Sequence, residues 1–560
     1  MRTNGAANFF TLSPRQPLTP APYAITAGNV VSGGIPSGIY GNAVTFSNAN
    51  NNFSGAFSGS GANVTNVNAA PLGGLTSSNF WQLGGNNVAA GKFLGSTNNQ
   101  PLELRVNNQR AMQLVYASNA VSGYSPNLIG GHTANYARSG VVGATIAGGG
   151  NTGVFGTNAV LADFGTVLGG QGNTAGGKYS TVGGLLSAAN GQYSTALGGV
   201  ATADADFATA MGQSTASGTN STAMGQSTAT RNNATAMGNS SATNDLATAM
   251  GNSTAGGYGS TAVGASLAKG WRSSALGYST ALGAYSTALG ASSTDSGANA
   301  STAMGASQAV DPYCTAMGSS YAGRDGLGGG AYATAMGSNS WATGFASTAL
   351  GYDNDASGFG SVAMGSACVA SGDYSIAAGV NAEALTYGSF VWADGLGYSF
   401  YSDAPNQARF RATGGFIVVT GINGSGVATA GASLAPNATS WSVVSDRNAK
   451  KNLQPLDTVA VLDKLASIPI THWNYNWEAD TSTPHLGPMA QDFKAAFYPG
   501  RDDKTITTLE FDGVELAAIQ GLNQKLEEQR TELQTRDRRI TELESRLARM
   551  ERLRLETNSK

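Results

Sequence analysis

The sequence predicts a mainly β protein: a parallel β-solenoid, followed by a C-terminal α+β domain and a terminal coiled coil. The first observation is a phrase, Thr-Ala-Met-Gly or a close variant, whose glycine returns every 13 residues from Gly212 to Gly290. The second is charge, because residues 151–440 hold seven Lys or Arg and the last 41 residues hold ten. The third is a run of heptads near the C-terminus. A fixed period of this length indicates a solenoid, in which each repeat buries its apolar face against its neighbours.

These patterns divide the chain into six segments. Residues 1–29 lack the apolar stretch of a secretory signal. We therefore expect them to be the end of an upstream domain, with the export signal encoded before Met1. Residues 30–139 are rich in Asn, Gly and Ser with spaced Phe and Val, which predicts a β-fibre shaft or connector. The other segments are β-roll repeats at 140–386, a β neck at 387–440, an α+β domain at 441–518 and a coiled coil at 519–556.

Each repeat contains two half-phrases, which predicts a coil of two short strands and two tight turns. After the marker glycine comes Ser-x-Ala, as in Ser214–Ala216, and a turn residue such as Gly218 lies six residues past the marker. Sixteen markers between Gly169 and Gly379 give 15 steps that average 14 residues. If each step advances the stack by one strand spacing of ~4.8 Å, the solenoid is roughly 70 Å long.

The third position of the phrase is expected to be the interior of the coil. Side chains alternate faces along a strand, so this slot and the Thr share one face and the Ala takes the other. Apolar residues fill the slot, and Met packs well into irregular gaps. We expect the opposite face of Ala and Ser to pack against two other copies in a homotrimer. Eight of the 12 Met occupy the slot: Met211, Met224, Met237, Met250, Met304, Met317, Met336 and Met364.

Phrase, period and slot together resemble the head repeats of trimeric autotransporter adhesins. The resemblance covers residues 140–386 and implies a left-handed parallel β-roll in a trimeric fibre. A calcium-binding β-roll is the competing repeat fold, and it requires Gly-Gly-x-Gly-x-Asp nonapeptides. The sequence contains none of them.

Composition excludes several classes of function. A net charge of −3 gives no electrostatic basis for binding nucleic acid or an anionic membrane. No apolar run reaches 18 residues, so no membrane insertion is expected. Three His and two Cys, widely separated, cannot form a metal-ligand cluster, and no cofactor is expected. Cys314 and Cys368 are expected to be small buried residues rather than a disulfide.

The motif that carries chemistry is Ser-Asp-Arg-Asn-Ala-Lys-Lys-Asn at 445–452. A Ser hydroxyl is a weak nucleophile until a base takes its proton, and Lys can be that base where burial favours its neutral form. Ser445 is therefore a candidate nucleophile, with a lysine of the same motif as its base. The alternative is structural, because Ser445 or Asp446 ahead of a charged turn is also typical of a helix N-cap.

Two later motifs, Trp-Asn-Tyr at 473–475 and His-Leu-Gly-Pro-Met-Ala-Gln-Asp-Phe at 485–493, follow in order. Together with the first motif they resemble the intramolecular chaperone auto-processing domain of phage tailspikes and tail fibres. The resemblance implies a serine peptidase-like domain that assembles the trimer and then cuts itself off once, between Val444 and Ser445. It assigns Ser445 and Lys450 as the catalytic pair, with Asp446 also matching. Arg447 departs from the pattern by one position.

The last segment has the heptad pattern of a coiled coil. Gln529 and Arg536 interrupt its second heptad position, and such interruptions fix register and oligomer state. Sustained heptads of this kind predict a coiled coil over 519–556. The first position is occupied by Ile519, Leu526, Leu533, Ile540 and Leu547, and the second by Leu522, Leu543 and Met550.

The sequence therefore predicts a trimeric fibre or adhesin, on a cell surface or a virion, that binds a glycan or another surface receptor. Aromatic residues five or six positions before the marker glycines are expected to stack along one edge, with Trp271 and Tyr285 as candidate ligand-binding residues. A structural ladder that covers the turns is the alternative. The aromatic residues are Tyr258, Trp271, Tyr285, Tyr313, Tyr332, Phe345, Phe359 and Tyr374.

The second candidate function is a tailspike that degrades polysaccharide. A glycosidase needs two carboxylates roughly 5–9.5 Å apart across a groove. The acids of the repeats occur singly in turns, which favours the fibre over the enzyme. They include Asp204, Asp206, Asp245, Asp295, Asp353 and Asp355.

Overall fold

The computed structural model describes residues 50, 80–153, 156–499 and 501–559. The chain divides into two units, Met1–Gly95 and Ser96–Lys560. The described residues of the first unit form turns and bends, without a helix or strand. The expected upstream remnant at 1–29 and much of the expected shaft lie outside the described residues.

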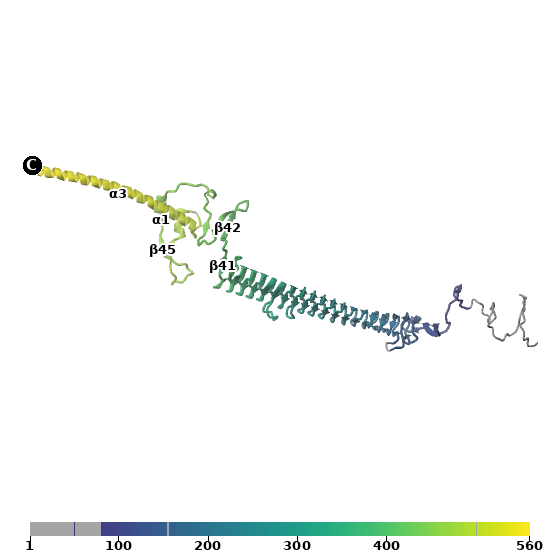
Figure 1. Cartoon of the computed structure of the whole chain (residues 1–560). Coiled ribbons are helices and arrows are strands. Elements are labelled where there is room, and N and C mark those ends of the chain that lie inside the picture. Colours follow the sequence, from purple (N-terminus) through teal and green to yellow (C-terminus); the bar gives the residue numbers. More distant parts are fainter. Residues whose placement is uncertain (1–49, 51–79, 154–155, 500, 560) are drawn as a thin grey trace, which may run out of the picture. The chain divides into compact units, whose positions relative to one another are not determined.

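The second unit begins with an antiparallel hairpin, β1 (Leu102–Val106) and β2 (Gln109–Val115), and β2 also pairs antiparallel with β5 (Asn127–Gly130). A separate short pair, β3 (Ser118–Asn119) and β4 (Gly123–Tyr124), follows β2. From β5 onward the pairings of the 39-stranded sheet are parallel, and they continue as far as β41 (Ala408–Arg411). The solenoid (Figure 1) therefore extends on both sides of the range expected from the repeats.

Each coil contributes one strand to each of two parallel sheets, as the two half-phrases predict. The strand of the Thr-Ala-Met-Gly phrase belongs to what we call the Met sheet, and the strand of the Ser-x-Ala phrase to the Thr sheet. Strand β17 (Thr222–Gly225) lies between β15 (Thr209–Gly212) and β19 (Thr235–Met237), with Thr opposite Thr, Ala opposite Ala and Met opposite Met. Exact register follows because every coil repeats the same side-chain pattern.

The Met sheet runs through most of the solenoid. It comprises β5, β7 (Thr145–Ile146), β9 (Thr166–Gln171), β11 (Thr181–Leu185), β13 (Thr195–Gly199), β15 (Thr209–Gly212), β17, β19 (Thr235–Met237), β21 (Thr248–Met250), β23 (Thr261–Val263), β25 (Ser274–Leu276), β27 (Thr287–Leu289), β29 (Thr302–Gly305), β33 (Thr348–Tyr352), β35 (Val362–Ser366), β37 (Ile376–Val380), β39 (Phe390–Ala393) and β41 (Ala408–Arg411).

The Thr sheet runs beside it, and β31 (Thr315–Ala322) and β32 (Thr334–Ala342) pass through both sheets. The Thr sheet comprises β6 (Tyr136–Ala137), β8 (Ala159–Val160), β10 (Thr174–Ala175), β12 (Ala188–Ala189), β14 (Thr202–Ala203), β16 (Thr215–Ala216), β18 (Thr228–Ala229), β20 (Ser241–Ala242), β22 (Thr254–Ala255), β24 (Leu267–Ala268), β26 (Thr280–Ala281), β28 (Ser293–Thr294), β30 (Gln308–Ala309), β34 (Asp355–Ala356), β36 (Val369–Ala370), β38 (Ala382–Ala384) and β40 (Phe400–Tyr401).

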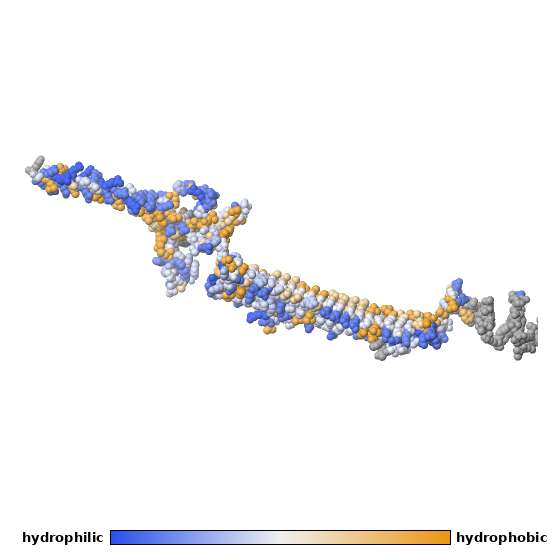
Figure 2. Space-filling view, in the orientation of Figure 1, coloured by the Kyte–Doolittle hydropathy of each residue, from blue (hydrophilic) through white to orange (hydrophobic). Residues whose placement is uncertain are grey.

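The interior of the solenoid is built of Ala, so the prediction that Met fills it is wrong. Ala223 of the Met sheet and Ala229 of the Thr sheet are both 0% exposed, whereas Met224 is only half-buried. The two sheets of so short a coil leave room between them for little more than methyl groups. The expected packing of the Ala face against other copies is therefore also wrong, because that face is already buried within one chain. The outer surface of the solenoid instead carries apolar residues along one side (Figure 2).

Small polar residues fill the rest of the interior and form hydrogen bonds with buried backbone amides and carbonyls. The Ser227 hydroxyl accepts from the Ser240 amide at 3.2 Å, and the Ser240 hydroxyl donates to the Met237 carbonyl at 2.8 Å. Equivalent serines thus form the same hydrogen bonds in successive coils, and these bonds pair buried backbone groups. Cys314 and Cys368 are free and buried, as predicted for small interior residues.

The space around the turn glycines shows how closely successive coils are packed. A Cβ on Gly257 would lie 2.0 Å from the Gly270 carbonyl oxygen, whereas a Cβ on its neighbour Gly256 meets nothing closer than 3.5 Å. Neither glycine has a left-handed backbone. We expect Gly257→Ala to lower the free energy of unfolding by about 1–3 kcal/mol, as overpacking does. Gly256→Ala, the matched control, should be nearly neutral, and equal melting temperatures for the two variants would contradict this packing.

Beyond the solenoid, a three-stranded antiparallel sheet forms what we call the neck sheet. It contains β42 (Phe416–Ile422), β43 (Ala428–Leu434) and β44 (Ser442–Val443). Large apolar residues on its strands are exposed, including Ile417 at 70% and Ile422 at 66%. A sheet with so much uncovered apolar surface is incomplete as a single copy.

The α+β domain that follows is small. It comprises the 3-10 turn η3 (Arg447–Ala449), α1 (Thr458–Ala466), the hairpin β45 (Ile470–Trp473) and β46 (His485–Pro488), α2 (Ala490–Phe497) and the long helix α3 (Thr508–Asn558). The first turns of α3 pack on α1, and a Cβ on Gly521 would lie 2.2 Å from the Thr458 carbonyl oxygen. The core consists of Val461, Ile468, Phe493, Val514, Ala517 and Ala518.

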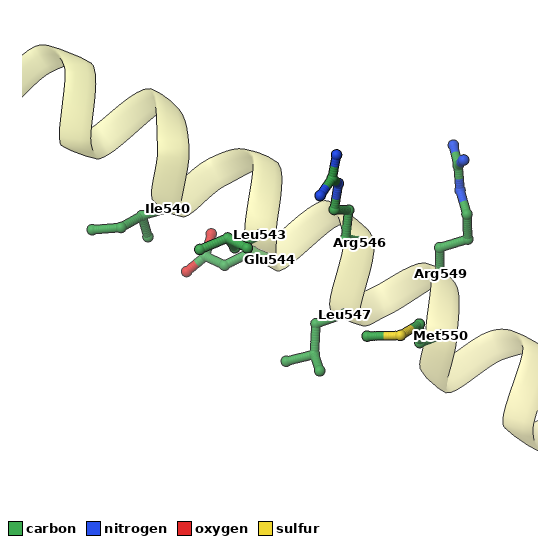
Figure 3. A pocket seen from close by; sticks show the side chains of 7 residues that line it. All are labelled: Ile540, Leu543, Glu544, Arg546, Leu547, Arg549 and Met550. Carbon is green, nitrogen blue, oxygen red and sulfur yellow. The ribbon is translucent and has the colours of Figure 1, made fainter.

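Most of α3 presents an unpaired apolar seam. Figure 3 shows Ile540, Leu547 and Met550 on one side of the helix and Arg546 and Arg549 on the other. The heptad residues are 43–61% exposed from Ile519 to Met550. In the described part of the chain, no helix combines the length and apolar character needed to cross a bilayer.

Candidate functional site

The segment that carries Ser445 connects the neck sheet to the α+β domain. Strand β44 ends at Val443, and η3 begins at Arg447. Ser445 therefore lies in the short extended link between a strand and a helical turn. Both Ser445 and Lys450 are exposed in the single chain.

The structure brings Ser445 and Lys450 together. The Lys450 Nζ donates to the Ser445 Oγ at 2.8 Å. The turn η3 returns the chain so that a residue five positions later reaches the hydroxyl. This distance lies within the range that a general base needs to take a proton from a nucleophile.

Asp446 takes the structural role that was the alternative for this motif. It is the N-cap of η3, and its Oδ1 accepts from the Asn448 amide at 2.9 Å and from the Asn448 side chain at 3.3 Å. Capping by Asp446 leaves the Ser445 hydroxyl available to Lys450. No hydrogen bond joins Asp446 to Ser445 or Lys450 in the described segment.

Val444, the residue before the candidate nucleophile, borders the neck sheet. Its side chain is 50% exposed and lines an apolar cavity of about 230 Å³. The pairing of Val443 with Ala432 fixes the strand that leads into the Val444–Ser445 bond. The other walls of the cavity include Ile417, Val418, Val419, Ala428 and Ala430.

The α+β domain also contains an aromatic cluster at the hairpin β45–β46. The Trp473 ring stacks on the His485 ring at 4.7 Å, and His485 Nε2 lies 3.0 Å from Glu478 Oε1. The hydrogen bond from His485 lowers the pKa of the Glu478 carboxyl. The sequence motifs identified Trp473 and His485 but missed Glu478. The available signal was an acidic residue seven positions before His485.

Trp271 and Tyr285 belong to an aromatic ladder along the turns. Trp271 contacts the Tyr285 ring at 4.6 Å and the Tyr258 ring at 6.1 Å, and the Arg272 guanidinium lies 4.8 Å from its centroid. Neighbouring coils continue the contacts elsewhere, as from Tyr313 through Tyr387. The predicted stacking is therefore confirmed, and these rings are engaged with each other.

A loop at 323–330 departs from the regular coil. The step between Gly318 and Gly337 is 19 residues, which is the sequence signal of this insertion. Asp311, which is 0% exposed, holds the loop by accepting from the amides of Arg324, Gly328 and Gly330 at 2.7–2.8 Å. Burial alone would raise the pKa of Asp311, but these amide donors outweigh it and the pKa is lowered.

Removing the charge of Asp311 should release the loop. Asn keeps one acceptor oxygen, so Asp311→Asn leaves at least one loop amide without an acceptor, at a total cost of about 1–3 kcal/mol, and trypsin should cut after Arg324 roughly 5–150-fold faster. Because the folded-state pKa is lowered, this stabilisation exists above the ordinary Asp pKa and is lost as pH falls through the folded-state value. Asp353→Asn, at an exposed acid, is the control. Equal cleavage rates in both variants would show that Asp311 does not hold the loop.

The described residues contain no group of three His, Cys, Asp or Glu that could hold a metal ion. Ser445 and Lys450 are the one sequence-predicted pair that the structure joins by a direct hydrogen bond suited to chemistry.

Comparison with known protein families agrees with both resemblances. Residues 445–500 match the peptidase S74 family, described as chaperone of endosialidase. The YadA head domain repeat matches at 189–215, 212–226, 216–241, 329–354 and 356–388. All of these matched segments lie within the solenoid. No curated protein matches the chain.

These two matches indicate a fibre or adhesin, exposed on a surface or a virion, whose assembly is aided by its C-terminal chaperone domain. Families of both kinds are typically trimeric. The chaperone match begins at Ser445, so the candidate pair lies at the start of that domain.

Proposed function

We propose that this protein is a homotrimeric fibre that binds a cell-surface receptor through its solenoid, and that its C-terminal domain cuts the chain once after assembly. The observation that carries the cleavage proposal is the 2.8 Å hydrogen bond between Lys450 Nζ and Ser445 Oγ. A lysine amine at this distance from the hydroxyl that follows the Val444–Ser445 bond supports Lys450 as the base of the reaction.

The chemistry is an acyl shift followed by hydrolysis. Lys450, once neutral, takes the Ser445 hydroxyl proton, and Oγ attacks the carbonyl carbon of Val444. The C–N bond breaks, the Ser445 nitrogen leaves as an amine after protonation, and Val444 is held as an ester on Oγ. Water then hydrolyses the ester, giving a Val444 carboxylate and a Ser445 with free amine and hydroxyl. No cofactor takes part.

Exposure of the pair in one chain favours cleavage that depends on assembly. A solvated Lys is protonated at neutral pH and is a poor base, whereas exclusion of water favours its neutral form. Both residues are exposed in the single chain. Burial against other copies would supply the missing environment, and a cut made before the fibre has formed would discard the chaperone too early.

The surfaces left uncovered support a trimer built on the Met sheet. Its outward column holds Met224, Met237, Met250 and Val263, and continues with Leu276, which is 38% exposed. The corresponding positions of the Thr sheet are mostly Thr and Ser. An apolar stripe repeated along the whole solenoid fits burial against identical stripes of two other copies.

The uncovered neck sheet and the seam of α3 support the same assembly. The apolar surfaces of both would be buried if three copies were arranged about one axis, because the same residues of each copy would then lie at the same height along the axis. Intact mass spectrometry and light scattering of the purified full-length chain test the proposal together. We expect pieces 1–444 and 445–560 and a trimer mass, and an uncut monomer would overturn both parts.

A further inference from the structure

One short part of the Thr sheet carries a surface unlike the rest. The outward slot of this sheet holds Thr or Ser in eight of the ten coils from β10 to β28, but Tyr321 and Trp341 fill it in two successive coils. The two residues are direct neighbours in the register of β31 and β32. Their rings stack with centroids 4.9 Å apart and planes 26° apart, and Trp341 is 46% exposed.

The next coil leaves one face of Trp341 open. Tyr321 covers the face on its own side, and the neighbour on the other side is Asp355, which pairs with Trp341 in the register of β32 and β34. An Asp side chain is too short to cover an indole. The open face of the ring therefore looks onto the space above Asp355. By contrast, Trp271 of the turn ladder has aromatic rings as neighbours in both directions.

One oxygen of the Asp355 carboxyl group lacks a hydrogen-bond donor. Asp355 Oδ1 is buried and has no hydrogen-bond partner among the described residues. Burial raises the pKa of this carboxyl. Asp355 as a whole is only half-buried, so a hydroxyl or amine at the surface can meet its carboxyl group, while the buried Oδ1 lies beneath and is not itself a ligand contact.

The loop at 323–330 forms a fixed wall on the far side of the aromatic pair. The Tyr321 hydroxyl donates to the Arg324 carbonyl at 3.2 Å. Asp311 anchors the loop, and a Cβ on Gly297 would lie 2.2 Å from the Gly326 carbonyl oxygen, so the loop also abuts an earlier turn. An aromatic platform held by a rigid scaffold is suited to recognition at low entropic cost.

The charge around the platform limits what can bind. Burial raises the pKa of Tyr321, and the nearby charges of Asp295, Asp311 and Asp325 raise it further. With Asp355 on the other side, acids flank the aromatic pair on both sides and outnumber Arg324, the one cation of the loop at 323–330. Phosphates and other anions are repelled there, which argues against a nucleic acid even though bases also stack on aromatic rings.

We propose that Trp341, Tyr321 and Asp355 form the receptor site of this fibre and bind a neutral or amino-bearing pyranose of a cell-surface glycan. The C–H face of a pyranose carries partial positive charge and stacks on the negative face of an indole. Its hydroxyl or amino groups lie at the ring edge, within reach of Asp355. This inference rests on the proposed binding function and replaces Trp271 and Tyr285 as its site.

The test uses the full-length protein on an array of immobilised neutral, amino-bearing and sialylated oligosaccharides, followed by titration of the strongest binder. Trp341→Thr and Tyr321→Thr restore the residue that other coils use, so the fold should persist. We expect Trp341→Thr to weaken binding at least 10-fold and Tyr321→Thr and Asp355→Asn to weaken it less. Trp271→Ser, from the turn ladder, should bind as wild type.

Several outcomes would overturn the inference. They are an array without signal, a preference for sialylated oligosaccharides, and unchanged affinity in Trp341→Thr. Light scattering and mass spectrometry of the same samples separate this failure from failure of the proposed function. A cut trimer that binds no glycan removes the pyranose site alone, whereas an uncut monomer removes the assembly on which it rests.

Discussion

Ser445→Ala is expected to leave every chain at 560 residues, whereas the wild type yields pieces 1–444 and 445–560. The substitution removes the one hydroxyl that Lys450 contacts, and without it no acyl shift at Val444 can begin. Loss of a nucleophile is an all-or-none effect for a reaction that each chain performs once. Intact mass spectrometry after expression measures it directly.

The adjacent lysines provide a matched pair. Lys450→Ala should also leave the chain whole, and Lys450→Arg should do the same, because Arg keeps the donor but cannot lose its proton in a protein. Lys451→Ala should cut normally, since no described hydrogen bond joins Lys451 to Ser445. Cleavage in Lys450→Ala at the wild-type rate would assign the base to another group.

Dependence on assembly is tested in the long helix. Leu526→Pro places a proline inside α3, which costs about 3 kcal/mol or more in a helix interior. We expect it to weaken the trimer and to leave the chain uncut although Ser445 and Lys450 are intact. An uncut wild-type chain in a well-formed trimer would instead mean that Ser445 is not a nucleophile here, and that the domain stays attached as a trimerisation unit.

The period of the repeat was sufficient to predict the solenoid, its two strands per coil and the exact stacking of neighbouring turns. The face that points inward was not predictable from apolar character alone. Alternation places Met224 and Ala223 on opposite faces, but which face is interior depends on the width of the coil. Because the two sheets lie close together, only the smaller of the two side chains fits between them, and Ala223 is accordingly 0% exposed.

For the candidate site, the resemblance to the auto-processing domain implied that Ser445 and Lys450 form a pair, and the backbone turn at η3 supplies the physical reason that they meet. Sequence could not distinguish which residue caps that turn, because Ser445 and Asp446 are both good N-caps. The platform of Tyr321 and Trp341 was also missed, since the inserted loop separates the two residues by 20 positions, more than the regular period, although the stacking of coils makes them neighbours.

The Met sheet gives the second large expected effect. The double variant Met237→Lys and Met250→Lys would place six positive charges of a trimer near one axis. A charge buried without a partner costs several kcal/mol, and here like charges also repel. We expect the fragment 1–444 of this variant to be monomeric, while the wild-type fragment stays trimeric.

The fragment is the right species for this measurement, because cleavage would remove α3. Among its described residues, the solenoid and the neck sheet are then the surfaces that can hold the copies together. Thr228→Lys and Thr254→Lys form the matched control, with the same charges on the outward slot of the Thr sheet. Light scattering of both fragments decides between the two faces. If the Thr-sheet lysines dissociate the trimer and the Met-sheet lysines do not, the copies pack through the Thr sheet. The platform at Trp341, on that sheet, would then face another copy rather than a receptor, so this single comparison tests the interface and the accessibility of the binding site together.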